Sequence, residues 1–151
     1  MSKWIALRKR SSAGFTLVEL MVVVVIASVL MAIAIPSYID KVRKSRRTEA
    51  KTTLLDIAGR EERFFNTSNT YSSLPSDLGY GAVGAIFPMT VGSGYYTVNV
   101  VSAPAAGAVP ASYTITATPL GDQLKDAQCL LFQLTSLGVQ SSTPDTTDCW
   151  K

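Results

Sequence analysis

The chain contains one long apolar run, followed by a stretch in which apolar residues recur on one side of a helix. From Leu20 to Ile35 the only polar side chain is that of Ser28. A helix from Phe15 to Ile35 has 21 residues and, at about 1.5 Å per residue, spans about 31 Å, the thickness of one bilayer core. The pattern therefore predicts a membrane-spanning helix.

Sequence typical of a helix resumes directly after Pro36. A proline inside a helix removes one backbone hydrogen bond and should kink the helix; the alternative is a helix that ends there. Apolar positions from Ala50 onward form a one-sided stripe, which should pack against a sheet. We therefore expect a hydrophobic helix over residues 15–36, kinked at Pro36, and an amphipathic helix over residues 37–65.

The remaining residues, 66–151, should form a head of strands and turns. The part from Asn66 to Gly94 is rich in turn residues and predicts a long loop. Segments rich in β-branched and aromatic residues follow at Tyr95–Val101, Ser112–Thr118, Cys129–Leu134 and, through a hairpin, Val139–Ser142. In the second of these, Tyr113, Ile115 and Ala117 share one face. One long helix on three or four antiparallel strands is an α+β fold.

Glu19 is an ionisable group one turn into the apolar helix. Moving an unpaired carboxylate into lipid costs about 2.5–3.5 kcal/mol, so this acid is a functional-site candidate that needs a partner. Small residues, Ala13 and Gly14, precede the apolar run instead of following it, as they would in an ordinary secretory signal. A cut after Gly14 would free an α-amino group on Phe15, which at a spacing of four residues could reach Glu19 of its own chain or of a neighbour.

The residues before the run complete this pattern. Lys3, Arg8, Lys9 and Arg10 form a basic head without an acid, as in an export signal. The segment GFTLVELM from Gly14 to Met21, with the basic leader before it and Pro36 after the run, resembles the class III signal and N-terminal helix of type IV prepilins. A plain signal anchor with a stray acid is the alternative.

This resemblance implies specific processing and assembly. A membrane prepilin peptidase would cleave between Gly14 and Phe15, removing residues 1–14, and would N-methylate Phe15. Glu19 would neutralise the amine of an adjacent subunit during assembly. Partners would be other pilin subunits in a helical filament and the inner-membrane assembly machinery.

Two cysteines, Cys129 and Cys149, enclose 19 residues near the end of the chain. In a small exported domain such a pair predicts one disulfide, worth about 3 kcal/mol for a loop of this length. A redox pair would favour CxxC spacing, and a zinc site would lack histidine ligands. Cations flank the apolar run on both sides, so the disulfide decides the orientation and places the head in the periplasm. Trp150 should pack over the disulfide.

The charge of the chain changes along its length. Asp40 to Phe65 holds eight Lys or Arg and five acids, whereas Asn66 to Trp150 holds one Lys and five Asp. The basic cluster KVRKSRR, residues 41–47, lacks interleaved aromatics, which favours a solvated or lipid-facing surface over a nucleic-acid site. A basic stem therefore carries an acidic head, and nucleic acid is not the expected partner.

Nothing in the composition points to catalysis. The chain has no histidine, which removes Ser-His and Cys-His nucleophilic machinery. Asp145 and Asp148 could contribute to a Ca²⁺ site, but carboxylates in a turn-rich tail are usually solvated. We expect no enzyme activity, no cofactor and no bound metal.

The segments SYTITATP, Cys129 to Gly138 and Cys149-Trp150 resemble PilE-type minor pilins. The resemblance implies the type IV pilin fold and a structural subunit of a type IV pilus, a minor pilin in pilus assembly and hence in twitching motility or adhesion. The subunit would lie in the inner membrane first and in the pilus afterwards. The alternatives are a pseudopilin of type II secretion and a pilus-borne receptor for DNA or a surface.

Overall fold

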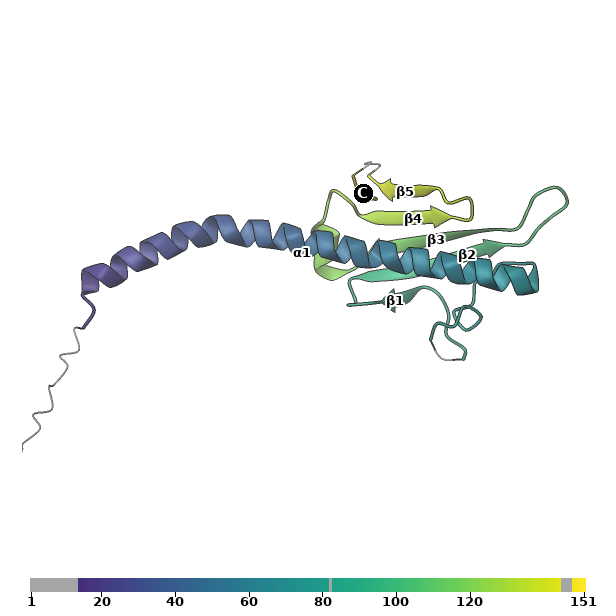
Figure 1. The fold of residues 1–151 in the computed structure, drawn as a ribbon, viewed down its shortest axis with the longest axis horizontal. Coiled ribbons are helices and arrows are strands. Elements are labelled where there is room, and N and C mark those ends of the chain that lie inside the picture. Colours follow the sequence, from purple (N-terminus) through teal and green to yellow (C-terminus); the bar gives the residue numbers. More distant parts are fainter. Residues whose placement is uncertain (1–13, 82, 145–147) are drawn as a thin grey trace, which may run out of the picture. The chain divides into compact units, whose positions relative to one another are not determined.

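The computed structural model describes residues 14–81, 83–144 and 148–151, drawn in Figure 1. Most of the predicted leader and the calcium candidate Asp145 lie outside the described residues. The chain divides into two compact units, one ending at Ile39 and the other beginning at Asp40. In the first unit the described residues form an apolar helical segment, and the second unit is an α+β head.

One helix, α1, runs from Leu17 to Ser68 and contains 52 residues. It continues through Pro36, so the expectation that the helix goes on beyond this proline is confirmed, while the kink stays a prediction. The helix begins two residues later and ends three residues later than predicted. It ends where Asn69 adopts a positive φ of 52° and donates its backbone N–H to the carbonyl of Phe65, a conformation common just after helix C-termini.

The head contains a five-stranded antiparallel sheet in which each strand pairs with the next along the chain. The strands are β1 (Met89–Val91), β2 (Tyr96–Ala103), β3 (Ser112–Pro119), β4 (Leu131–Thr135) and β5 (Gln140–Thr143). Val100 lies opposite Ile115, which lies opposite Leu134. The predicted fold class is confirmed and all four predicted strands are present, with bounds shifted by up to two residues.

Strand β1 was not predicted, and it corrects the expected number of strands from three or four to five. Its three residues follow a Gly-rich and Pro-containing stretch that gives no strand signal. It exists because its backbone pairs with β2, with Met89 opposite Val98. A pairing of this kind depends on the neighbouring strand and is not encoded in local sequence.

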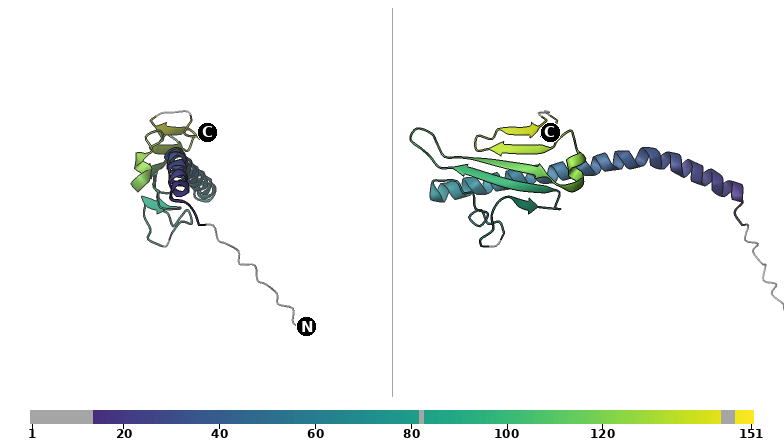
Figure 2. Two further views of the ribbon diagram at one scale, coloured as in Figure 1. Left: turned by 90° about the vertical axis from the view of Figure 1, so that its left-hand side faces the viewer. Right: turned by 180° about the vertical axis from the view of Figure 1, so that it is seen from behind.

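The second part of α1 packs on one face of the sheet, and the other face is left uncovered by the helix (Figure 2). Ala50, Leu54 and Ile57 are buried on the helix. Burying a Leu or Ile side chain contributes about 1.5–3 kcal/mol, so this stripe holds the helix to the sheet. The sheet meets it with alternate buried residues: Val98, Val100, Tyr113, Ile115, Ala117, Phe132 and Leu134.

The predicted disulfide joins the end of the chain to the segment just before β4. Cys129 and Cys149 form a disulfide with a Cα–Cα distance of 5.7 Å, and both are buried. Trp150 packs edge-on against Phe132, with ring centroids 5.7 Å apart, and donates its indole N–H to the backbone carbonyl of Ser141 at 2.7 Å. This contact covers part of the edge strand β5, which would otherwise be open to pairing with another chain.

Candidate functional site

The start of α1 is organised by a side-chain cap. The Thr16 hydroxyl accepts a hydrogen bond from the backbone N–H of Glu19 at 3.2 Å, so Thr16 is the N-cap and Glu19 lies in the first turn. A negative charge at this end of a helix is stabilised by the helix dipole. No described residue forms an ion pair with Glu19, so the partner expected from the sequence stays a prediction.

The helix surface that follows is apolar and uncovered. Phe15 is 83% exposed and Leu30 is 62% exposed. By length and composition the helix can cross a membrane, since one 18-residue window has a mean hydropathy of 2.8 and none of it is buried. An uncovered apolar surface of this length in water is strongly unfavourable. It therefore requires lipid or other protein chains around it.

The one polar side chain within the run is satisfied inside the helix. The Ser28 hydroxyl lies 2.5 Å from the carbonyl oxygen of Val24, to which it donates, and 3.1 Å from that of Val25. A hydroxyl without a hydrogen-bond partner costs several kcal/mol in an apolar medium. Because Ser28 is bonded to its own backbone, the run behaves as an apolar surface throughout.

The basic cluster, residues 41–47, is not a uniformly solvated face, because two of its side chains contact the rest of the head. Arg47 forms a two-pronged ion pair with Asp126, at Nε–Oδ2 2.6 Å for one prong, and their side chains are only 11% and 3% exposed. The hydrogen bond that it donates to Asp126 raises the pKa of Arg47. The guanidinium of Arg46 lies 3.4 Å from the centre of the Tyr95 ring. Two of the five cations therefore attach the helix to the head.

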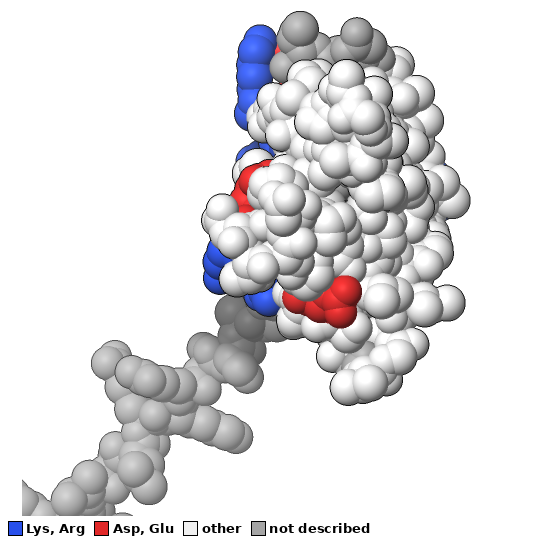
Figure 3. All heavy atoms as spheres, turned by 90° about the vertical axis from the view of Figure 1, so that its right-hand side faces the viewer, with Lys and Arg blue, Asp and Glu red and all other residues white. Residues whose placement is uncertain are grey.

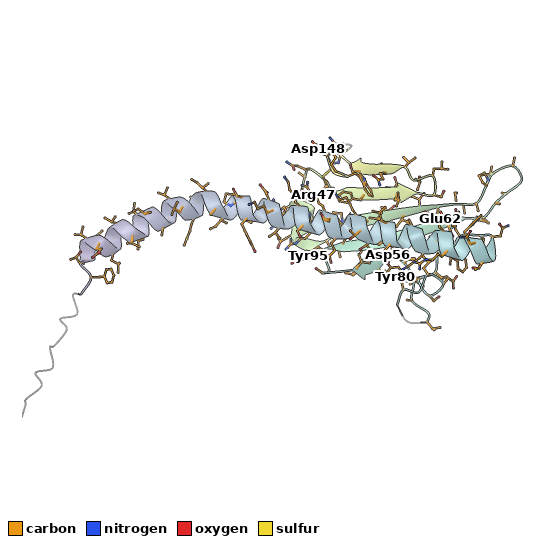
Figure 4. All side chains as sticks on the ribbon, in the orientation of Figure 1. Arg47, Asp56, Glu62, Tyr80, Tyr95 and Asp148 are labelled. Carbon is orange, nitrogen blue, oxygen red and sulfur yellow. A yellow bond between two sulfur atoms is a disulfide. The ribbon has the colours of Figure 1, made fainter. Side chains whose placement is uncertain are left out.

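A second set of contacts ties the loop after α1 to the helix. Asp56 accepts a hydrogen bond from the Tyr80 hydroxyl; both residues are labelled in Figure 4. Arg60 donates to the backbone carbonyl of Leu78 at 3.0 Å. Burial and the Asp56 contact raise the pKa of Tyr80 to about 12. The loop predicted from Asn66 to Gly94 is therefore held against α1 along much of its length.

Glu61 is the buried charge of this region. It is fully buried, its Oε2 accepts a hydrogen bond from the backbone N–H of Ser72 at 3.1 Å, and its Oε1 has no hydrogen-bond partner among the described residues. Burial raises the pKa of Glu61 to about 7, and the neighbouring carboxylates Glu62 and Asp77 act in the same direction. Near neutral pH the side chain is therefore divided between its protonated and ionised forms.

The structure brings some predicted residues together and leaves others apart. Cys129 and Cys149 are bonded as expected. Gly14, Phe15 and Glu19 lie close in sequence at the start of α1, and their proposed roles remain predictions. Asp148 pairs with Lys151 at 3.0 Å, and no described residues form a group of three or more metal ligands.

Two family models match the sequence. The model for the type IV minor pilin ComP, DNA uptake sequence receptor, matches residues 36–133, and the prokaryotic N-terminal methylation motif matches residues 9–35. The chain belongs to the type IV minor pilin family. The resemblance of residues 14–21 to the type IV prepilin signal is thereby confirmed at the level of the family.

Curated relatives include both pilins and a secretion protein. The type IV major pilin protein PilA of Myxococcus xanthus is 42% identical over 67 residues, which are 44% of this minor pilin and 30% of PilA. Fimbrial protein EcpC of Eikenella corrodens is 32% identical over 118 residues, covering 78% of this chain and 72% of EcpC. The type II secretion system core protein G of Pseudomonas aeruginosa is 32% identical over 72 residues, covering 48% of this chain and 51% of that protein.

The matched segment thus spans less than a third of PilA and about half of core protein G. Among solved structures, a type IV pilin from Shewanella oneidensis aligns with 72% of this chain and 98% of its own, at 22% sequence identity and a TM-score of 0.48.

Proposed function

We propose that this minor pilin is a structural subunit of a type IV pilus. Its leader, residues 1–14, is removed between Gly14 and Phe15 by a prepilin peptidase, which then methylates the new amino group of Phe15. Residues 15–36 anchor the subunit in the inner membrane, with the head, residues 66–151, in the periplasm. The inner-membrane assembly machinery then transfers the subunit into the fibre.

The observation that carries this proposal is the uncovered apolar part of α1 with Glu19 at its start. The large apolar side chains from Leu17 to Ile39 are all exposed. Such a surface fits lipid before assembly and a bundle of identical helices afterwards. When the helix passes from lipid into the bundle, its apolar surface stays out of water, because the interior of a helical bundle is also apolar. The free-energy cost of the transfer is therefore small.

Glu19 makes the fibre a more favourable environment than lipid. In lipid an unpaired carboxylate is costly. In a fibre, the methylated amine of Phe15 on an adjacent subunit would pair with it. Head-to-tail contacts that do not close on themselves extend into a helical filament, and the Glu19–amine pair would fix the register of each added subunit. Pilus assembly would then support twitching motility or adhesion.

Core protein G supports a second candidate, a pseudopilin of type II secretion, because it matches about half of this chain. The two functions differ in where the processed chain accumulates. Surface fibres should be sheared from cells and compared with membranes by immunoblotting, in the parent strain and in strains lacking either the pilus or the secretion assembly ATPase. Recovery in sheared fibres that depends on the pilus ATPase supports the proposal, and recovery that depends on the secretion ATPase contradicts it.

The family description supports a third candidate, a receptor for DNA. The charge of the head argues against a DNA receptor, since residues 78–121 contain no Lys, Arg, Asp or Glu. Figure 3 shows one face of the molecule, on which few side chains are charged. A gel-shift titration of the full chain with duplex DNA tests this candidate. Affinity that falls steeply with salt concentration would support the receptor function.

A further inference from the structure

A hollow of about 280 Å³ opens beside the first part of α1 in the head, between the helix and residues 125–128. A second hollow, of about 180 Å³, lies between the helix and the end of the chain. Lys44 and Arg47 line both, and we name the two hollows together the basic groove. Its charged lining consists of six cations and three carboxylates: Arg43, Lys44, Arg47, Lys51, Lys125 and Lys151, and Asp40, Asp126 and Asp148.

The cations of the basic groove differ in how firmly they are held. Arg47 is committed to Asp126 in a nearly buried pair. Lys125 and Lys151 form exposed pairs with carboxylates three residues away, and such pairs contribute only about 0–1 kcal/mol, so they exchange readily for another anion. Lys44 is exposed and forms no ion pair with any described residue. Arg43 pairs with Asp40, and Lys51 donates to the backbone carbonyl of Lys151 at 2.9 Å. Lys44 is therefore the cation of the groove whose side chain has neither an ion pair nor a hydrogen bond with any described residue.

The position of Lys44 along α1 places it close to the end of the apolar run. It follows Ile35 by nine residues of helix, at most about 14 Å along the axis whatever the direction of the helix at Pro36. Helical side chains lean toward the N-terminus, so the Lys44 side chain leans back toward the apolar run. The headgroup layer of a bilayer begins where the apolar run ends and is about 5–8 Å thick on each side, so the long side chain of Lys44 is the part that can reach it. Tyr38, which lies between Ile35 and Lys44 in the sequence, is 70% exposed, and tyrosine is a residue enriched at the membrane–water interface.

From this arrangement we infer that the basic groove binds the phosphate group of an anionic phospholipid in the leaflet that the head faces. The inference rests on the proposed membrane anchor. A single lipid phosphate can enter beside Lys44 and exchange with the exposed pairs, whereas the exposed carboxylates of Asp40 and Asp148 in the lining repel the continuous row of phosphates of a duplex. Bound lipid would hold the subunit at a fixed depth until assembly removes it from the membrane.

The test uses the full chain in nanodiscs of phosphatidylcholine that contain a minor fraction of spin-labelled phosphatidylglycerol or, in a parallel sample, spin-labelled phosphatidylcholine. The ratio of motionally restricted labels measures the preference for the anionic lipid. We expect Lys44→Gln to lower this preference about five-fold, the effect of one cation near an anionic bilayer. Lys44→Arg should retain it.

Arg63→Gln is the matched control, because Arg63 is an exposed cation of the same helix about 29 Å further along its axis and outside the groove. The leader cations are present in every variant and cancel in the comparison. An unchanged preference in Lys44→Gln overturns the inference, as does an equal loss in Arg63→Gln, which would mean that net charge alone attracts the lipid.

Two further arms identify the source of the phosphate. In neutral nanodiscs, saturable binding of inorganic phosphate that depends on Lys44 would assign the groove to a free anion instead of a lipid. Lys44-dependent binding of duplex DNA, without a lipid preference, would assign it to nucleic acid. Flotation of the nanodisc sample separately reports insertion: a chain that inserts but shows no preference overturns only the lipid site, whereas a chain that fails to insert contradicts the anchor as well.

Discussion

Both parts of α1 carry large apolar side chains, but these side chains have opposite surroundings. Leu30, in the first part, is 62% exposed, whereas Leu54, in the second, is fully buried against the sheet. The second part packs against the sheet of the same chain. The first part has no packing partner among the described residues, and its partner must be supplied from outside, by lipid and then by other subunits.

This difference separates two kinds of stability in one helix. Changes in the second part should act on the folding of an isolated chain. Changes in the first part should leave folding intact and act on processing, membrane retention and assembly.

The largest effect should come from Gly14→Val. A bulky side chain at the proposed cleavage site should block the peptidase and leave nearly all of the chain uncut and in the membrane. An added Cβ at Gly14 meets nothing within 4 Å, so the head should fold normally. Immunoblots of membranes and sheared fibres measure the outcome, with Gly14→Ala as the control that should still be cut. Efficient processing of Gly14→Val would contradict the assigned cleavage site.

Glu19→Ala should separate processing from assembly. We expect normal leader removal, because Glu19 lies beyond the cut. Incorporation into fibres should fall by roughly a hundredfold to several thousandfold, since leaving one charge of a buried pair unpaired costs about 3–5 kcal/mol. Glu19→Gln, which keeps the shape and removes the charge, should behave alike. Quantitative blots of sheared fibres from cells that also make normal subunits provide the measurement, and normal incorporation would exclude the proposed pairing.

A matched pair of leucine substitutions tests the contrast directly. Leu54→Ala should lower the free energy of unfolding of the head by about 2–5 kcal/mol, because it leaves a cavity in the core. Leu30→Ala should change it by less than about 0.5 kcal/mol, as expected for an exposed site. Urea titrations of both full-length variants in the same detergent, followed by near-UV circular dichroism, give the two values. Equal losses would mean that the two parts of the helix share a partner.

Glu61 predicts a smaller, pH-dependent effect. Its pKa is raised to about 7 in the folded chain, whereas an unperturbed glutamate titrates near 4.3. Between about pH 4.5 and 7 the folded chain therefore binds more protons than the unfolded chain, and stability falls as the pH rises through this window. Above about pH 7 both forms are ionised and this contribution becomes constant.

Glu61→Gln cannot ionise and should lose this slope. At pH 8 the variant should be more stable than the parent chain by about 3–4 kcal/mol. Its amide oxygen can still accept the hydrogen bond from Ser72. Urea titrations of the two chains from pH 5 to 8 give the difference, with Asp122→Asn, which removes an exposed carboxylate outside this cluster, as the control. A pH-independent difference would show that Glu61 is not titrating in this range.

Much of the fold could be predicted because it depends on periodicity within single elements. The stripe of Ala50, Leu54 and Ile57 gave the packed face of α1, and the alternation of Tyr113, Ile115 and Ala117 gave the inner face of β3; all six are buried. Features that depend on distant partners were missed. Arg47 and Asp126 are 79 residues apart, and no local pattern distinguishes Arg47 from the solvated cations beside it.

The candidate site divides in the same way. The apolar run and Glu19 could be recognised because a charge inside such a run stands out in the sequence alone. Glu61 could not be recognised as a buried residue, because its sequence context is that of an exposed helical glutamate. It is buried by the loop that follows α1, whose Ser72 donates a hydrogen bond to it. Strand β1 was likewise invisible, because its formation depends on the backbone of β2.

The central claim is that processing at Gly14 frees the amine of Phe15 and that the uncovered part of α1 then passes from lipid into a fibre. The most direct test is the intact mass and amino-terminal sequence of the chain from sheared surface fibres, without reducing agent. We predict a chain that starts at methylated Phe15 and lacks the two thiol hydrogens of Cys129 and Cys149. A chain that still begins at Met1 would contradict the claim and identify residues 15–36 as a plain signal anchor.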